Sequence, residues 1–160
     1  MKTYAVIGKS VPQIAASAKA TGEARYTGDV SLPGLLHGKI LRSPLPHARI
    51  LQVDVSRAVR LAGVKAVATG RDTLGVKTGG IAAKPEYRDR QGICVDKVRY
   101  IGDAVAAVAA ADEDTAEEAL ELVRVEYEEL PAVFHPRDAM APGAPRLHDH
   151  AEDNCSISVR

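Results

Sequence analysis

The chain has 160 residues with 21 basic and 21 acidic side chains, so its formal net charge is zero. Hydrophobic residues make up 46% and charged residues 26%, which is typical of a folded globular chain. A chain of this length buries about 70% of its unfolded surface, enough for a core without metal or disulfide staples. The balanced charge argues against nucleic acids and anionic membranes as partners, and the absence of tryptophan argues against a base-stacking surface.

Cysteine usage and the N-terminus indicate a reducing compartment. Cys94 and Cys155 match no metal-binding spacing or disulfide-rich framework, although one disulfide between them stays open. The first ten residues lack an apolar core of signal-peptide length. The longest apolar run, Ala104–Ala111, has eight residues, far below the ~20 that cross a bilayer. We therefore expect a cytoplasmic protein without a membrane or nucleic-acid partner.

The first elements follow an irregular lead-in over residues 1–35, which glycines and prolines interrupt. Only Glu23–Tyr26 in that stretch resembles a strand. Leu36–Arg42 is predicted as a strand, and Ser43–Pro46 as a loop, because two prolines so spaced do not fit a central strand. Ala48–Val55 alternates in hydrophobicity and predicts a half-buried strand. Its apolar face is predicted to consist of Leu51, Val53 and Val55.

A short helix is predicted next, with Ser56 as its N-cap, Arg57–Ala62 as its body and Gly63 as its stop. Val64–Thr69 is again extended, and residues 70–92 form a long loop, which is usually functional or a mobile excursion.

Two strands, Val98–Tyr100 and Ala104–Ala110, flank a turn at Gly102 and Asp103. The small residues of the second strand predict close packing on both of its faces.

The clearest helix is Asp112–Val123, which Asp114 is predicted to cap together with Glu117. Its buried stripe is predicted to be Ala116, Ala119, Leu120 and Val123. A period-two strand around Val125 and Tyr127 ends at Pro131, and no compact element is expected after Met140. The order of elements favours an α+β domain of mixed strands with two main helices, having its core in residues 36–135 and a linker in 136–160.

The stretch Gly70–Thr78 lies one residue from a phosphate-loop motif, with Val76 between Gly75 and Lys77. Because glycines and Pro85 follow instead of a helix, we favour a plain loop over nucleotide binding.

The C-terminal tail gathers potential zinc ligands without a zinc-site spacing, so a solvated linker is favoured there. These residues are His148, Asp149, His150, Glu152, Asp153 and Cys155.

No spacing indicates a nucleophile paired with a base. Ser43 lies in a proline-flanked loop, and His37, His47 and His135 have no partner spacing. The dense carboxylates of residues 117–129 are explained as solvated faces of a helix and a strand. The residues therefore predict a scaffold-like domain with no catalytic, cofactor-binding or metal-binding residue, in which Ser43–Arg49 and residues 70–92 are the loops available for contacts.

Four segments in order, Gly8–Ile50, Gly63–Asp72, Asp96–Phe134 and Leu147–Ser156, resemble a known family. They are similar to the N-terminal α/β hammerhead domain of the molybdenum-binding large subunit of the xanthine dehydrogenase/aldehyde oxidase family. The resemblance implies an oxidoreductase that uses a molybdenum–pterin cofactor, in bacteria the cytosine dinucleotide, with [2Fe–2S] clusters and FAD on other domains or subunits. It also implies that the cofactor contacts and the active-site glutamate lie beyond Arg160.

The resemblance transfers no catalytic residue to this chain, which is expected to be inactive alone. The matching strings RSPLPHAR (Arg42–Arg49) and RYIGD (Arg99–Asp103) are expected to pack the domain against the cofactor-binding domain of the same subunit and against the iron–sulfur and FAD subunits. Such a role predicts an exposed apolar patch larger than a monomer shows. Within the family, the stretch from Gly102 to His150 resembles the α subunit of 4-hydroxybenzoyl-CoA reductase, followed by xanthine dehydrogenase subunits, and residues 75–92 are expected to vary with the substrate. A stand-alone protein-binding or assembly module is the alternative.

Overall fold

In the computed structural model, residues 4–74, 76–79, 90–151 and 153–155 are described. The chain divides into two compact units, Met1–Leu35 and Leu36–Arg160. The first unit contains the helix α1 (Ala16–Thr21) and the 3-10 turn η1 (Thr27–Asp29), and none of its described residues is buried.

The strand-like stretch predicted at Glu23–Tyr26 is wrong, because these residues form no strand. Gly22 ends α1 in the left-handed conformation, with φ of 78°. Tyr26 then begins η1, where its backbone N–H donates to Asp29 Oδ2 at 2.9 Å. Because each end of the stretch is fixed by a local cap, the intervening residues join two short turns.

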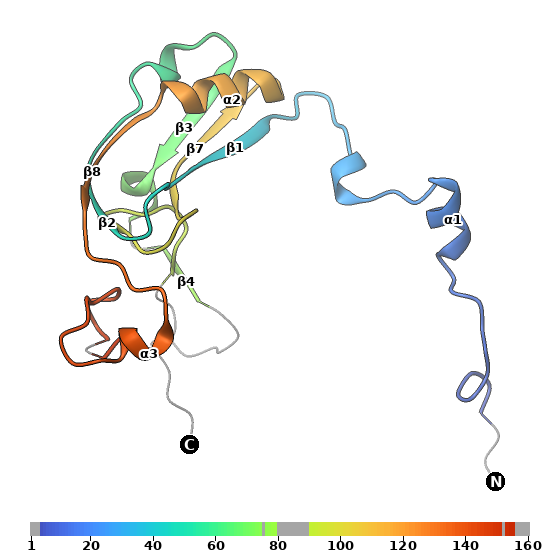
Figure 1. Ribbon diagram of the computed structural model, residues 1–160. Coiled ribbons are helices and arrows are strands. Elements are labelled where there is room, and N and C mark those ends of the chain that lie inside the picture. The colour runs from blue at the N-terminus through green and yellow to red at the C-terminus, as the bar shows by residue number, and fades with distance from the viewer. Residues whose placement is uncertain (1–3, 75, 80–89, 152, 156–160) are drawn as a thin grey trace. The chain divides into compact units, whose positions relative to one another are not determined.

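The second unit is built from antiparallel strand pairs, in three small sheets with the orders β1-β7-β3, β6-β2-β8 and β4-β5 (Figure 1). The strands are β1 (His37–Arg42), β2 (Ala48–Asp54), β3 (Val64–Thr69), β4 (Lys77–Thr78), β5 (Arg90–Gln91), β6 (Lys97–Val98), β7 (Ala104–Ala110) and β8 (Arg124–Glu129). The predicted strands over residues 36–42, 48–55, 64–69, 104–110 and around 125–127 all have counterparts here. The strand predicted over Val98–Tyr100 is wrong in its extent, since β6 ends at Val98.

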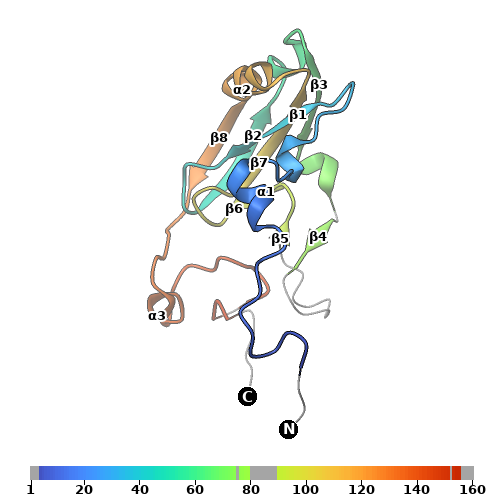
Figure 2. The same cartoon turned by 90° about the vertical axis from the view of Figure 1, so that its right-hand side faces the viewer.

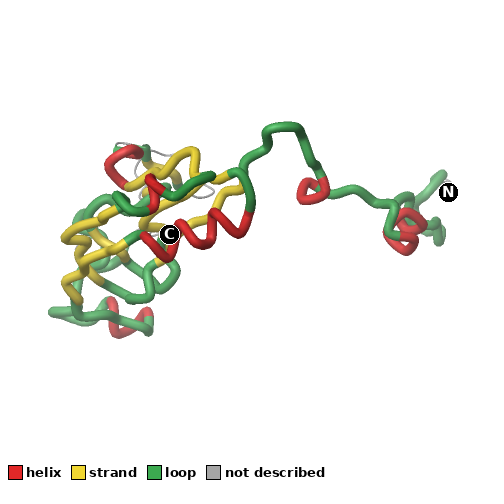
Figure 3. Tube along the Cα trace, turned by 90° about the horizontal axis from the view of Figure 1, so that it is seen from above, coloured by secondary structure: helices red, strands yellow, loops and turns green. Residues whose placement is uncertain are grey.

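The helix α2 (Glu113–Leu122) lies across one face of the sheet β1-β7-β3 (Figures 1 and 3). The other helical elements in the described part of the unit are a four-residue helix α3 (Pro136–Ala139) and two 3-10 turns, η2 (Ala58–Arg60) and η3 (Gly70–Thr73). Strands with few helices in this arrangement confirm the α+β class.

The helix predicted over Arg57–Ala62 is wrong in its extent, since only the 3-10 turn η2 forms there. Ser56 is not its cap. Instead, the backbone N–H of Ser56 donates to Asp54 Oδ1 at 2.8 Å, and Gly63 turns the chain with φ of 96°. The segment between β2 and β3 therefore contains a single 3-10 turn and no α-helix.

Two hydrophobic clusters meet on opposite faces of β7. Ala106 and Val108 pack with α2, whereas Val105 belongs to the second cluster. The buried partners are Ala58, Ala119 and Val123 in the first cluster and Ala48, Cys94 and Val98 in the second. The expected close packing on both faces of this alanine-rich strand is confirmed.

The predicted apolar face of β2 is wrong at Leu51. The pairing of β2 with β8 shifts register between Ile50 and Gln52, and Leu51 is 58% exposed. Ile50 packs against the second cluster in its place, and Val53 stays in the core. An extra residue in one strand of a pair reverses which side chains face the core, and alternation alone does not reveal it.

The N-cap of α2 lies two residues earlier than predicted. Asp112, not Asp114, is its N-cap, and the Asp112 carboxylate accepts the backbone N–H of Thr115 at 2.8 Å. The predicted buried stripe is confirmed, with Ala116 and Ala119 fully buried and its other members buried or half-buried.

Candidate functional site

A cavity of about 320 Å³ lies in the second unit, at the end away from α2. Figure 2 shows the short strand β5, whose residues Arg90 and Gln91 line the cavity, below the sheet that α2 covers. Its charged lining residues are Arg90, Arg99 and Asp103. Its uncharged lining residues are Gln91, Cys94, Tyr100 and His148. Arg99, Tyr100 and Asp103 lie in the RYIGD string, but sequence reasoning did not join them to residues 90–94 or to His148, which lie in separate segments.

Asp103 is the centre of this cavity. It is 7% exposed, and its Oδ2 accepts the backbone N–H of Arg99 at 3.0 Å. The Cys94 thiol and the Tyr100 hydroxyl also hydrogen-bond to its carboxylate. The buried negative charge is therefore shared among three donors from the same chain.

The thiol and the phenol are both held in their protonated forms. Burial raises the pKa of Cys94 to about 12, and the hydrogen bond to Asp103 adds to this shift. Burial and the nearby Asp103 charge also raise the pKa of Tyr100. Because a thiol is nucleophilic and binds metal as the thiolate, Cys94 is suited to neither role at neutral pH.

Arg99 ties the C-terminal tail to the cavity wall. Its Nε donates to the carbonyl of Leu147 at 3.0 Å and its Nη1 to the carbonyl of Lys97 at 2.8 Å. Its Nη2 lies 3.8 Å from Asp96 Oδ1. Lys97 reaches the same tail through an ion pair of 3.0 Å with Asp149. These contacts position His148 at the cavity.

Asn154 closes the tail into a fixed loop. Its side chain accepts the backbone N–H of Leu147 at 2.8 Å and donates to the carbonyls of Ala139 and Pro145 at 2.8 and 2.9 Å. Its φ of 56° is in the left-handed region, which asparagine tolerates better than most residues.

The potential metal ligands of the tail are not assembled into a site within the described ranges, where no group of three such side chains is placed to hold an ion. The rings of His148 and His150 stand edge to face at 5.5 Å, and the Lys97 ammonium lowers the pKa of Asp149. Glu152, the remaining carboxylate beside them, lies outside the described residues.

The near-match to a phosphate loop forms a closed turn. Thr69 N–H donates to Asp72 Oδ2 at 2.7 Å, and Arg71 N–H donates to Thr69 Oγ1 at 3.3 Å, so these amides are already used. A Cβ on Gly70 would lie 2.2 Å from the carbonyl oxygen of Cys94. This part of the loop is packed against backbone and offers no cradle for phosphate, while Gly75 lies outside the described residues.

The segments RSPLPHAR and RYIGD are joined by backbone contacts. Ser43 N–H donates to the carbonyl of Asp103, and Gly102 N–H to the carbonyl of Ser43, each at 2.8 Å. Arg42 Nη1 donates to the carbonyl of Gly102 at 2.9 Å. Two segments about 60 residues apart in sequence therefore form one rigid corner.

His47 is buried beside this corner, only 3% exposed, with Nδ1 2.7 Å from the carbonyl oxygen of Pro131. Its Nε2 is buried and has no hydrogen-bond partner within the described structure. Ser43, equally buried, uses its hydroxyl locally with the backbone of Leu45 at 3.0 Å. Neither side chain forms a nucleophile–base pair with the other.

The remaining candidate residues have structural contacts. His135 caps α3, accepting the backbone N–H of Arg137 on Nδ1 at 3.2 Å. Glu117 and its neighbour Glu113 bind Lys39 of β1 at 2.7 and 2.5 Å. Glu128 pairs with Arg49 across β2 and β8. His37 lies at the exposed start of β1.

The chain is similar in sequence to a known domain family and to subunits of known dehydrogenases. Residues 21–131 match the family described as "Aldehyde oxidase and xanthine dehydrogenase, a/b hammerhead domain". The chain is 48% identical to a probable xanthine dehydrogenase subunit of Bacillus subtilis, over 82% of this chain and 17% of that protein. It is 37% identical to the nicotinate dehydrogenase large molybdopterin subunit of Eubacterium barkeri, over 92% of this chain and 34% of that protein.

The solved aldehyde oxidoreductase of Desulfovibrio gigas superposes with a TM-score of 0.79 at 34% identity, covering 87% of this chain and 16% of that one. The chain thus spans only 17% and 34% of the two curated relatives. None of the helices in the described ranges combines the length and apolar character of a membrane span.

Proposed function

The chain belongs to the aldehyde oxidase and xanthine dehydrogenase a/b hammerhead domain family, and we propose that it is the N-terminal structural domain of a molybdenum-containing oxidoreductase. In this role it packs against the cofactor-binding domain of the same subunit and carries out no chemistry by itself. The relatives named above are subunits of molybdenum hydroxylases and are several times longer than this chain.

One observation carries this proposal: the two least exposed charged groups of the cavity, Asp103 and Arg99, are committed to holding the fold. Asp103 is occupied by three internal donors, and Arg99 by the backbone of the tail. The protonated Cys94 thiol does not fit a metal site, and the described ranges hold no cluster of metal donors. These residues do not fit the molybdenum centre of the family, so we assign no step of its chemistry to this chain.

The corner formed by RSPLPHAR and RYIGD supports a packing role. At its tip, Tyr100 and Ile101 are 55% and 64% exposed although both are large and hydrophobic. The backbone bonds of Ser43 hold this tip rigidly, so little conformational entropy is lost when it docks. We assign this tip to contacts with the cofactor-binding domain.

The finer assignments extend the family resemblance. The parent enzyme is proposed to use molybdopterin cytosine dinucleotide, with [2Fe–2S] clusters and FAD on neighbouring subunits, and to act in the cytoplasm. Its substrate is proposed to be an aromatic CoA thioester, of the 4-hydroxybenzoyl-CoA reductase type, or a purine or aldehyde. The resemblance of the Gly102–His150 segment supports the first of these.

The test is metal analysis and activity assay of the purified 160-residue chain, followed by its co-expression with the large-subunit region that follows the hammerhead domain in a relative. We expect no molybdenum and no turnover alone, and a complex with that region that Ile101→Asp weakens. Stoichiometric molybdenum or turnover in the chain alone would overturn the proposal. A stable chain that never associates with such a region would favour a stand-alone binding module.

A further inference from the structure

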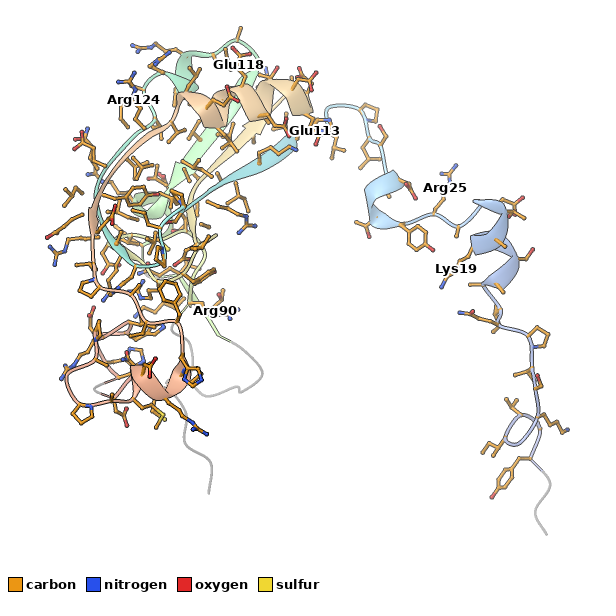
Figure 4. All side chains as sticks on the ribbon, viewed as in Figure 1. Lys19, Arg25, Arg90, Glu113, Glu118 and Arg124 are labelled. Carbon is orange, nitrogen blue, oxygen red and sulfur yellow. The ribbon has the colours of Figure 1, made fainter. Side chains whose placement is uncertain are left out.

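Of the two arginines that line the cavity around Asp103, one has a charge that no described residue neutralises. Arg99 is occupied by two carbonyls and lies near Asp96, and its side chain is 16% exposed. Arg90 lines the same cavity from the short strand β5, and its guanidinium makes no hydrogen bond or ion pair with any described residue. It lies at the end of the second unit opposite α2 (Figure 4).

Gln91, the residue after Arg90, supplies a second hydrogen-bond donor. The Gln91 carbonyl Oε1 accepts the backbone N–H of Val95 at 3.0 Å, which fixes the side-chain amide. Gln91 lines the cavity, and its amide nitrogen makes no hydrogen bond with any described residue. The Arg90 charge acts on the Tyr100 hydroxyl, which places the guanidinium near the phenol. The cavity thus presents an arginine fork and an amide donor close to an aromatic ring.

The carboxylate of Asp103, the negative group of the cavity, does not neutralise the Arg90 guanidinium. Asp103 is 7% exposed and accepts from Arg99, Cys94 and Tyr100, so its charge is already shared within the chain. A ligand that enters from the Arg90 side meets donors first. One unused cation selects a monoanion, and the planar guanidinium matches the two oxygens of a carboxylate.

We propose that this cavity binds a small monoanionic carboxylate with an apolar body. Arg90 and the Gln91 amide hold the carboxylate, and the Tyr100 ring contacts the body. The volume of about 320 Å³ is at the small end of ligand pockets and suits a single-ring acid rather than a nucleotide. The site shares Tyr100 with the tip that is assigned to docking, whereas Ile101 does not line the cavity.

Titration of the ¹⁵N-labelled chain with sodium benzoate, followed by NMR, tests the site. We expect saturable shifts at Gln91 and Tyr100 with a Kd in the range of about 0.1–5 mM. Benzyl alcohol, of the same shape but without charge, is expected to bind at least about tenfold more weakly. Inorganic phosphate and acetate serve as further probes, because they share the negative charge but lack the ring.

Arg90→Gln is expected to weaken benzoate at least about tenfold, and Arg90→Lys to weaken it less, since the charge remains without the fork. Arg124→Gln, which removes an exposed cation beside α2 at the other end of the unit, is the matched control and should bind as the parent does (Figure 4). Arg90 is exposed, so its variants are expected to fold.

Three results would overturn the proposal. The first is the absence of saturable shifts at Gln91 and Tyr100. The second is an equal loss of affinity in the Arg124 control, which shows non-specific charge attraction. The third is tighter binding of phosphate than of benzoate, which contradicts the carboxylate class.

Discussion

Gly70 stands where two stretches of backbone meet with no space for a side chain. A Cβ at this position would lie 2.2 Å from the carbonyl oxygen of Cys94 and 2.7 Å from Val95 Cα. Since both neighbours are backbone atoms, neither can move aside as a flexible side chain can. Gly70 therefore fixes how closely η3 approaches the segment that carries Cys94.

Gly70→Ala is expected to lower the free energy of unfolding by about 1–3 kcal/mol, the usual cost of overpacking. Gly92→Ala is the control, because nothing lies within 4 Å of its added Cβ and its φ is not positive. It should change stability by less than about 0.5 kcal/mol. Urea unfolding followed by circular dichroism measures both, and equal effects would contradict the close approach.

Cys94 links the cavity to stability at alkaline pH. Its pKa in the folded chain is about 12, against 9.0 for a free thiol, because burial disfavours the thiolate. Between these values the unfolded chain loses the proton and the folded chain keeps it, so stability falls as pH rises. The contribution is fully present below pH 9 and declines by about 1.4 kcal/mol per pH unit above it.

Cys94→Ser keeps a donor toward Asp103 but does not titrate in this range, so its stability should decline less steeply above pH 9 than that of the parent. Urea unfolding at intervals from pH 8 to about pH 10 measures the two slopes. Tyr100 and Tyr127 are present in both chains, and burial, not Cys94, is the main cause of their raised pKa, so they contribute similarly to the two slopes. Parallel slopes for the two chains would show that Cys94 is not buried as a thiol.

At the level of elements, local patterns predicted the strands β1, β2, β3, β7 and β8 and the helix α2, because alternation and helical spacing are properties of adjacent residues. The bulge at Leu51 was missed because it depends on how β2 pairs with β8, about 75 residues away. The cavity was missed for the same reason. The bond of Arg99 to the carbonyl of Leu147 brings His148 to the cavity that Arg90 and Asp103 line, and no local sequence pattern predicts that contact.

The helix α2 depends on the carboxylate of Asp112 as its N-cap. Asp112→Ala removes the acceptor of the Thr115 N–H and should lower Tm by roughly 3–6 °C. Asp114 lies two residues later, and its carboxylate makes no hydrogen bond among the described residues. Asp114→Ala should therefore lower Tm by less than about 2 °C. Thermal unfolding of both variants at neutral pH decides which aspartate is the cap.

The pH dependence of this cap has a definite sign. The Thr115 backbone N–H lowers the pKa of Asp112 in the folded chain, so its stabilisation is present above the unfolded pKa and is lost as pH falls through the folded one. The difference between the parent and Asp112→Ala should therefore shrink in acid. A difference that is the same at low pH would show that the effect of the substitution does not come from the charged cap.

For the molecule as a whole, the buried residues among those described all belong to the second unit, from Ser43 to Ala151. No described residue of the first unit is buried, and its Ile7, Ile14 and Leu32 are large, hydrophobic and more than 60% exposed. In the second unit Phe134 is 80% exposed. Exposed hydrophobic side chains of this kind are typical of a domain that docks on another protein. The single large apolar patch expected from the sequence stays a prediction.

A chain of residues 36–160 should therefore fold without residues 1–35. Its free energy of unfolding should lie within about 1 kcal/mol of that of the full chain, because no described residue of the first unit belongs to the core. Urea unfolding and the dispersion of amide NMR signals measure this. Loss of the cooperative transition would show that the first unit supplies part of the core.

Removal of residues 136–160, unlike removal of residues 1–35, is expected to destabilise the fold. Arg99 would lose its bond to Leu147, and Lys97 its ion pair with Asp149, although their side chains are only 16% and 11% exposed. Buried donors without partners cost about 1–3 kcal/mol each, so this chain should be clearly less stable than the 36–160 chain. Arg99→Ala in the full chain provides the matched variant, because it removes the same bond and leaves the tail in place. If the 1–135 chain is as stable as the full chain, the tail is not part of the folded unit, and the cavity that His148 helps to line is not a fixed feature of it.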